Sequence, residues 1–165
     1  MNKKLFVMLV VILVIAVMTI PASAKGTTDT PVSYSECITP VGVPTQWLAD
    51  GNMQMRNAYY VSDISDFSDD RLSGTLYGNE KVVIAHKDGR ANFQGTAKIV
   101  LPDGRGVWDG SWVGEGVMGV NWEIYIVLHG KEGEVKGLKA FITTTSDETY
   151  WCADSTGLIV NPGGK

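Results

Sequence analysis

The most regular feature of the chain is a strict alternation of residue types between positions 91 and 101. In this segment, ANFQGTAKIVL, small or apolar residues occupy the odd positions and polar residues occupy the even positions as far as Lys98. Successive side chains of a strand point to opposite faces, so a period of two predicts a strand with one buried and one solvated face. We therefore expect residues 91–101 to lie in a sheet that covers a hydrophobic core.

Several other segments show the same period of two and predict further strands. Turn-like clusters separate them, including Asp88-Gly89 and the sequence PDGR at 102–105. No segment shows a convincing period of 3.6 residues with helix caps. The further expected strands span residues 53–61, 72–86, 118–128, 135–145 and 148–162.

One more segment, GRGVWDGSWVGEG at residues 104–116, carries only glycine or tryptophan at its even positions. Glycine weakens the interior of a strand unless a bend or a close neighbour needs the space. Small barrels often alternate small and large side chains on the inner face. We expect the even face to point inward, with its glycines letting the sheet coil around two indoles. The alternative is that Trp108 and Trp112 line a partly open cavity.

Together these segments give about eight strands joined in chain order by short turns. Such an arrangement is an antiparallel meander, and closing it into a barrel removes its exposed edges. The expected fold is therefore all-β, a closed antiparallel meander barrel of about eight strands.

The first 24 residues have the composition of a leader. Two lysines precede an apolar run from Leu5 to Ile20, and the small residues ASA end the segment at Ala24. This pattern is typical of a secretory signal peptide, and an uncleaved N-terminal anchor is the alternative. We expect a secreted, extracellular protein, or one at the cell envelope if the segment is retained.

The remaining chain is expected to form one domain with an N-terminal extension. Residues 1–24 are the signal peptide, residues 25–46 an irregular arm rich in threonine and proline, and residues 47–165 the β-barrel domain. The net charge is −4, and removal of the leader would take away two lysines. An acidic chain without a basic cluster argues against binding to nucleic acid or, after signal cleavage, to a membrane surface.

The chain has two cysteines, Cys37 and Cys152, near opposite ends of the expected mature protein. Export favours a disulfide between them, which would tie the N-terminal arm to the final strand. Two free buried thiols are the alternative.

Three motifs resemble those of a known group of proteins. They are RLSGT at 71–75, the GxWxGxWxG pattern from Gly106 to Gly114, and GLKAF at 137–141. A group of uncharacterised small secreted bacterial β-barrel proteins carries similar RxSGT, WxGxW and GLxAx segments in this order. The resemblance covers residues 47–160 and implies a barrel similar to the allene oxide cyclase and dirigent type, with calycins as relatives in shape. It implies no catalytic residues.

Five residues are candidates for ligand binding. Trp108 and Trp112 offer large apolar surfaces with one N–H donor each, and Tyr59 shares its parity with the apolar residues of 53–61. Glu80 lies among apolar residues of its own parity, and Glu123 shares a face with polar neighbours. A carboxyl group that faces the barrel interior would have a raised pKa and suit proton transfer. In the alternative, both carboxyl groups face water.

No metal site or other cofactor site is expected. His86 and His129 lack neighbouring ligands at metal-binding spacing, and the acidic residues of 63–70 do not match a calcium loop. The sequence thus favours a small secreted barrel that binds a small apolar or aromatic ligand at its mouth. Two alternatives remain, an isomerase or cyclase-like enzyme that uses a lumen carboxylate and a structural envelope-associated barrel without a ligand.

Overall fold

The computed structural model of the chain describes residues 29–66, 68–85, 87–146 and 152–163. The expected signal peptide and His86 lie outside these ranges. The described residues form strands and one short 3-10 turn, η1 (Pro102–Gly104). The strands are β1 (Thr30–Cys37), β2 (Thr39–Val41), β3 (Thr45–Ala49), β4 (Asn52–Asp66), β5 (Gly74–Ala85), β6 (Arg90–Val100), β7 (Gly106–Val117), β8 (Asn121–Gly133), β9 (Lys139–Ser146) and β10 (Cys152–Val160). No helix in the described part of the chain is long and apolar enough to span a membrane.

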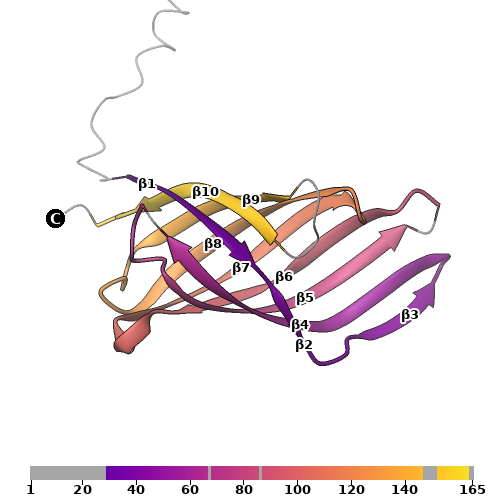
Figure 1. Ribbon diagram of the computed structural model, residues 1–165, viewed down its shortest axis with the longest axis horizontal. Helices are drawn as coiled ribbons and strands as arrows, with labels where there is room; N and C mark the ends of the chain where they lie inside the picture. The colour runs from indigo at the N-terminus through magenta and orange to yellow at the C-terminus, as the bar shows by residue number, and fades with distance from the viewer. Residues whose placement is uncertain (1–28, 67, 86, 147–151, 164–165) are drawn as a thin grey trace, which may run out of the picture.

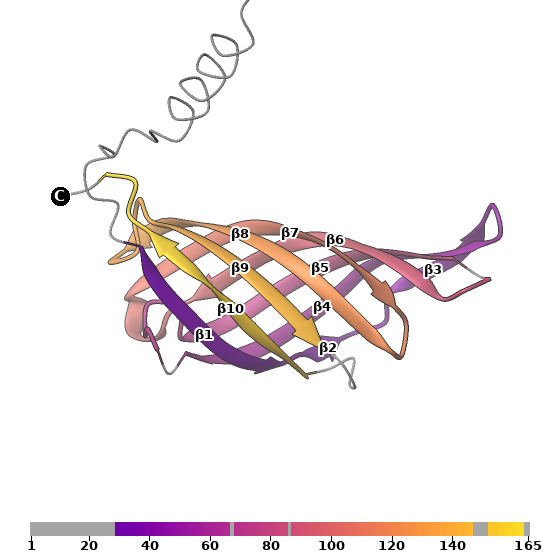
Figure 2. The same cartoon turned by 90° about the horizontal axis from the view of Figure 1, so that it is seen from above.

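The strands form one curled antiparallel sheet with the shape of a half-barrel (Figures 1 and 2). Neighbours follow the order β1-β10-β9-β8-β7-β6-β5-β4-β2, so every step from β10 to β4 joins strands that are consecutive in sequence. β3 pairs with the first part of β4, and the two strands form a hairpin at the right-hand end of Figure 1. A further short pairing, Tyr34 with Asp66 and Ser35 with Ser65, joins β1 to β4. The all-β expectation is confirmed.

The expected irregular arm of residues 25–46 contains strands instead. β1 pairs with β10 along its whole length, from Thr30 opposite Ile159 to Cys37 opposite Cys152. Side chains of β1 alternate between buried and exposed positions. The frequent threonines and prolines hid this alternation in the sequence. The expected disulfide between Cys37 and Cys152 is present at the last pair of this ladder.

The even face of β7 points inward, as expected. Trp108 and Trp112 are both buried. Three glycines of this face lie against the neighbouring strand, because a Cβ at Gly110, Gly114 or Gly116 would come within 2.4 Å of a backbone oxygen of β8. The absent side chains therefore allow close approach of two backbones in the curled sheet.

A β-bulge in β4 changes which side chains face inward. Between Met55 and Ala58, β4 advances three residues while its partner β5 advances two, and Asn57 has a φ of 56°. Beyond the bulge the parity is reversed. Tyr59 therefore points outward and is half exposed, and its neighbour Tyr60 packs against the core instead. The expectation that Tyr59 shares the face of Met55 is wrong, because β4 contains one extra residue between Met55 and Ala58 that a regular alternation does not include.

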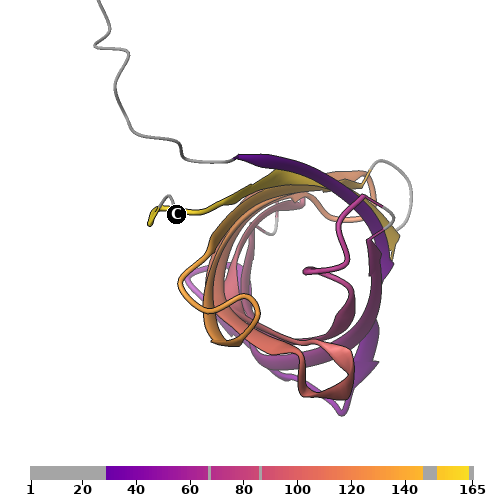
Figure 3. The same ribbon diagram turned by 90° about the vertical axis from the view of Figure 1, so that its left-hand side faces the viewer.

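The end of the sheet at which β4 leads into β5 is filled with side chains. Figure 3 looks along the sheet and shows the loop between these strands, in magenta, folded into this end. Leu72 of this loop is fully buried, as is Trp108 of β7. Trp108 Nε1 donates a hydrogen bond of 2.7 Å to the carbonyl oxygen of Arg71. Arg71 in turn forms an ion pair with Asp69, which lowers the pKa of that carboxyl group. We call this region the plugged end.

Candidate functional site

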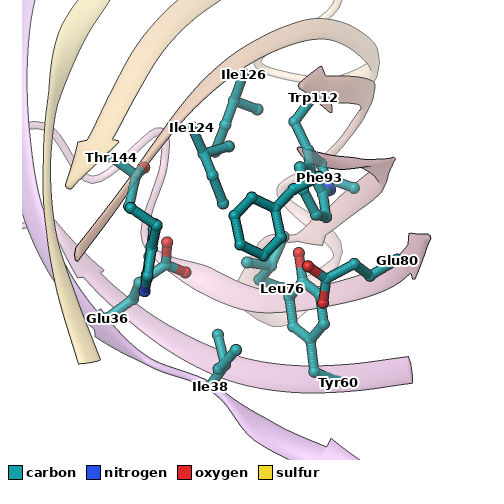
Figure 4. A pocket seen from close by; sticks show the side chains of 12 residues that line it. Glu36, Ile38, Tyr60, Leu76, Glu80, Phe93, Trp112, Ile124, Ile126 and Thr144 are labelled. Carbon is teal, nitrogen blue, oxygen red and sulfur yellow. The ribbon is translucent and has the colours of Figure 1, made fainter. Parts of the chain in front are cut away.

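A small cavity lies inside the curled sheet (Figure 4), and its lining includes Glu36 and Ile38, the two residues that flank Cys37. Its volume is about 40 Å³, whereas a dry protein cavity that binds benzene measures roughly 150 Å³. The space therefore admits a small chemical group and excludes a complete aromatic ring. Its apolar walls are formed mainly by side chains of β5, β6, β7 and β8, among them Leu76, Phe93, Trp112, Ile124 and Ile126.

Glu36 brings a carboxyl group into the cavity from β1. The residue precedes Cys37, so the disulfide and the β1–β10 ladder fix its position. Only 7 % of Glu36 is exposed, and burial raises the pKa of its carboxyl group to about 7. A charged carboxylate is poorly solvated in such surroundings, which favours the neutral acid.

Glu80 brings a second carboxyl group into the same cavity from β5. Figure 4 shows Glu36 and Glu80 extending into the space from different sides. Glu80 is 8 % exposed, and burial raises its pKa to about 7 as well. Among the described residues that line the cavity, none carries a positive charge. Both carboxyl groups therefore titrate near neutral pH without a cationic partner in the cavity wall.

The position of Trp112 depends on a glycine in the neighbouring strand. Glu80 of β5, Gly95 of β6 and Trp112 of β7 stand opposite one another in a row across the sheet. A Cβ at Gly95 would lie 2.6 Å from the Trp112 ring. The Trp112 indole therefore lies over the backbone of β6. It lines the same cavity as Glu80 of β5.

Three buried polar atoms at the cavity lack protein partners. Within the described part of the chain, no protein atom forms a hydrogen bond with Glu36 Oε2, Trp112 Nε1 or Trp122 Nε1. The cavity wall also contains Thr144, whose hydroxyl group shares a hydrogen bond of 2.7 Å with Ser155. A buried polar atom without a partner costs about 1–3 kcal/mol, so these atoms favour a polar group inside the cavity.

The structure brings together two of the five candidate residues. Glu80 and Trp112 line the cavity, whereas Trp108 belongs to the plugged end. Tyr59 lies on the outer face. Glu123 is also on the outer face, where it accepts a hydrogen bond of 2.7 Å from the Tyr125 hydroxyl group.

Sequence reasoning missed other lining residues for identifiable reasons. Glu36 lies in the segment expected to be irregular, although the alternation of VSYSE from Val32 to Glu36 carries the signal of a strand. Trp122 shares its parity with Ile124 and Ile126 in the expected strand of residues 118–128, but this pattern gives it no role at the site. Tyr60 is part of the cavity wall because the β-bulge reverses the parity of β4. The local signal of the bulge is Asn57, which has a positive φ, a conformation that asparagine adopts more readily than most residues.

The arrangement offers two kinds of chemistry. Aromatic and aliphatic walls can hold an apolar group, while the indole N–H groups and carboxyl groups fix the orientation of a polar one. Carboxyl groups that titrate near pH 7 can also donate or accept protons.

Comparison with known proteins identifies no relative. No family model, no curated protein and no solved structure matches the chain. The cavity and its residues are therefore the features from which a function can be inferred.

Proposed function

We propose that this protein is an exported carrier or sensor that binds a small, largely apolar ligand at one mouth of a β-barrel. The polar end of the ligand enters the cavity beside Glu36 and Glu80, and its apolar part remains at the mouth. The observation that carries this proposal is the group of partnerless polar atoms in an otherwise apolar cavity. A protein whose interior served packing alone would gain by filling this space with apolar side chains.

The proposal includes a closed barrel of eight strands, β1 and β4 to β10. The short β1–β4 pairing supports closure, because β1 is the first and β4 the last of these eight strands in the order of the sheet. The curled sheet and its plugged end agree with the cup shape of calycins and of the allene oxide cyclase and dirigent barrels. We also propose membership of the group of secreted bacterial barrel proteins with RxSGT and WxGxW motifs.

Export is supported by the leader composition of residues 1–24 and by the disulfide. A disulfide is compatible with an extracellular protein, since oxidising compartments preserve such bonds. Its position next to Glu36 gives it a second consequence, because the cross-link holds one carboxyl group at the cavity.

Native mass spectrometry of the protein from its own culture medium tests ligand binding. We expect an additional mass that disappears on denaturation. The same measurement on Ala97→Leu should show the bare polypeptide, because Ala97 lines the cavity and the added methyl groups fill it. Retention of the same mass by this variant would place the ligand elsewhere and contradict the proposal.

Ala140→Leu is the matched control for the cavity-filling change. Ala140 is fully buried on β9 outside the cavity. The larger side chain should overpack the core at a cost of about 1–3 kcal/mol. Ligand mass should nevertheless persist in the fraction of this variant that remains folded.

An isomerase or cyclase-like activity is the second candidate. The observation that favours it is the pair of carboxyl groups with pKa values of about 7 in one cavity, which suits general acid and base catalysis. Glu80→Gln would then abolish turnover while the protein still folds. A structural barrel without a ligand predicts instead a bare mass for the native protein and no change in any binding signal in Ala97→Leu.

A further inference from the structure

We propose that the polar end of the ligand is an ammonium group, so that the cavity selects small primary amines with an apolar tail. This inference rests on the proposed binding function and specifies its ligand class. Two observations carry it. Two acidic side chains enter one cavity without a cationic side chain among its described lining residues, and aromatic rings form much of the wall.

The electrostatics of the cavity favour a cationic ligand. Burial removes hydration from Glu36 and Glu80 and raises the pKa of each carboxyl group, so each carboxylate is poorly stabilised in the cavity. An ammonium ion in the same cavity offsets this loss, because it places a positive charge in the space that both carboxyl groups line. An anionic ligand would add a third negative charge, and a neutral ligand would leave the pair uncompensated.

The aromatic side chains of the cavity wall also favour a cation. Phe93, Trp112, Trp122 and Tyr60 all contribute to it. The face of an aromatic ring attracts a cation, most strongly in the case of tryptophan and in desolvated sites. The combination of aromatic faces and carboxylates is therefore better suited to a cation than to any neutral polar group.

The hydrogen-bonding capacity of the carboxyl groups also matches an ammonium group. An ammonium group has three donors and no acceptor, and an ionised carboxylate has about four acceptor sites. Glu36 Oε2 has no partner within the described part of the chain. When ionised, the carboxyl groups have enough acceptor sites for all three ammonium donors.

Size decides which part of the ligand enters. The cavity of about 40 Å³ holds an ammonium group and the carbon next to it, since one water needs about 10–15 Å³ in this measure. A ring must stay outside. The probe should therefore carry its amine on a short flexible arm, as 2-phenylethylamine does.

The pH dependence of binding distinguishes the ligand classes. Glu36 and Glu80 have pKa values of about 7, so both become charged as the pH rises through neutrality. Tyr60 is the other titratable group in the wall. Arg56 and Lys81 line a groove on the outer face that also reaches Glu80. Amine affinity should rise with pH, and binding of a neutral ligand of the same shape should not.

The test compares 2-phenylethylamine with 2-phenylethanol and phenylacetate by isothermal titration calorimetry at pH 5.5 and pH 8.0. The protein is used with its disulfide intact. We expect the affinity for the amine to be at least about tenfold higher at pH 8.0 than at pH 5.5, because the carboxyl groups are largely neutral at pH 5.5. The alcohol should change less than about twofold, and phenylacetate should bind most weakly at pH 8.0.

Variants locate the effect. Glu36→Gln and Glu80→Gln should each weaken amine binding at pH 8.0 by about tenfold or more and leave binding of the alcohol unchanged. The matched control is Glu123→Gln, which removes a carboxyl group on the outer face and should leave both affinities unchanged. A urea unfolding curve verifies that each variant is folded, and either glutamine variant alone suffices for the test.

The outcomes separate this inference from the function on which it rests. Equal binding of amine and alcohol at both pH values would overturn the ammonium assignment and preserve a binding cavity for neutral ligands. Tighter binding of phenylacetate would likewise overturn it. If none of the three probes binds and the native protein also carries no additional mass, both the inference and the binding function are wrong.

Discussion

At the scale of single residues, the two buried carboxyl groups make the stability of the protein depend on pH. Glu36 and Glu80 have folded-state pKa values of about 7, against an ordinary value of 4.5. The folded protein therefore holds protons that the unfolded chain releases between these two pH values. The stability associated with these protons is fully present below pH 4.5 and is lost as the pH rises through 7.

The free energy of unfolding should consequently fall between pH 5 and pH 8. The expected loss is about 3 kcal/mol for each carboxyl group, since one pKa unit corresponds to about 1.4 kcal/mol. Glutamine cannot ionise, so the Glu80→Gln variant should lose the contribution of Glu80 to this decline in the free energy of unfolding. Urea unfolding at both pH values measures the effect.

The control for this prediction is again Glu123→Gln, which should keep the pH dependence of the unaltered protein. Asp69 has a lowered pKa and contributes below the pH range of the measurement. A free energy of unfolding that is constant or rises from pH 5 to pH 8 would contradict the burial of both groups.

At the scale of elements, the contact between β6 and β7 shows why glycine and tryptophan share one face. Gly95 leaves space for the Trp112 ring, and the glycines of β7 allow the β8 backbone to approach. The large and absent side chains are therefore parts of one packing solution. The sheet can curl tightly and still fill its interior.

Gly95→Ala should disturb this arrangement. The added Cβ would lie 2.3 Å from the carbonyl oxygen of Asn79 and 2.6 Å from the Trp112 ring. We expect a loss of about 1–3 kcal/mol in the free energy of unfolding, as for other overpacked cores. A change in tryptophan fluorescence should accompany it, because the indole must move.

Gly163→Ala provides a comparison at a position with space. There the nearest atom to an added Cβ is Asn161 Oδ1 at 3.5 Å, an ordinary contact. This variant should unfold at the same urea concentration as the unaltered protein. Equal stability of both alanine variants would show that β6 and β7 tolerate greater separation than their packing indicates.

Periodicity predicted the strands well and the site in part. Alternation placed Glu80 and Trp112 on the inward face because β5 and β7 are regular across these positions. It failed for Tyr59, since the irregular pairing of β4 at Asn57 depends on the neighbouring strand. It failed for Glu36 because the polar composition of residues 25–46 outweighed a short alternating segment. The meeting of two carboxyl groups depends on strand order, which local patterns do not contain.

At the scale of the whole molecule, the disulfide connects residues that are 115 positions apart. It joins the first strand of the described chain to the last one. In the chain-entropy model, a cross-link of this length stabilises the folded state by about 4–5 kcal/mol, through restriction of the unfolded chain. The bond therefore contributes a large part of the stability that is typical of a domain of this size.

The double variant Cys37→Ala/Cys152→Ala should lose about 4–5 kcal/mol in the free energy of unfolding. Urea unfolding without reductant measures this loss. The unaltered protein should become equally unstable when a reductant cleaves the bond, and the double variant should not respond to the reductant. An unchanged unfolding midpoint in the double variant would contradict a stabilising role of the cross-link.

The β-bulge in β4 determines where the gene tolerates a change of length. Loss of the Asn57 codon would equalise the residue counts of β4 and β5 between Met55 and Ala58, and every other side chain would keep its face. Loss of the Val61 codon would move the side chains at one end of the strand to the opposite faces of the sheet. Deletion of Asn57 should therefore give a folded protein by circular dichroism, and deletion of Val61 should not. A lineage can thus shorten this wall of the cavity by one amino acid without exchanging its lining for its outer surface.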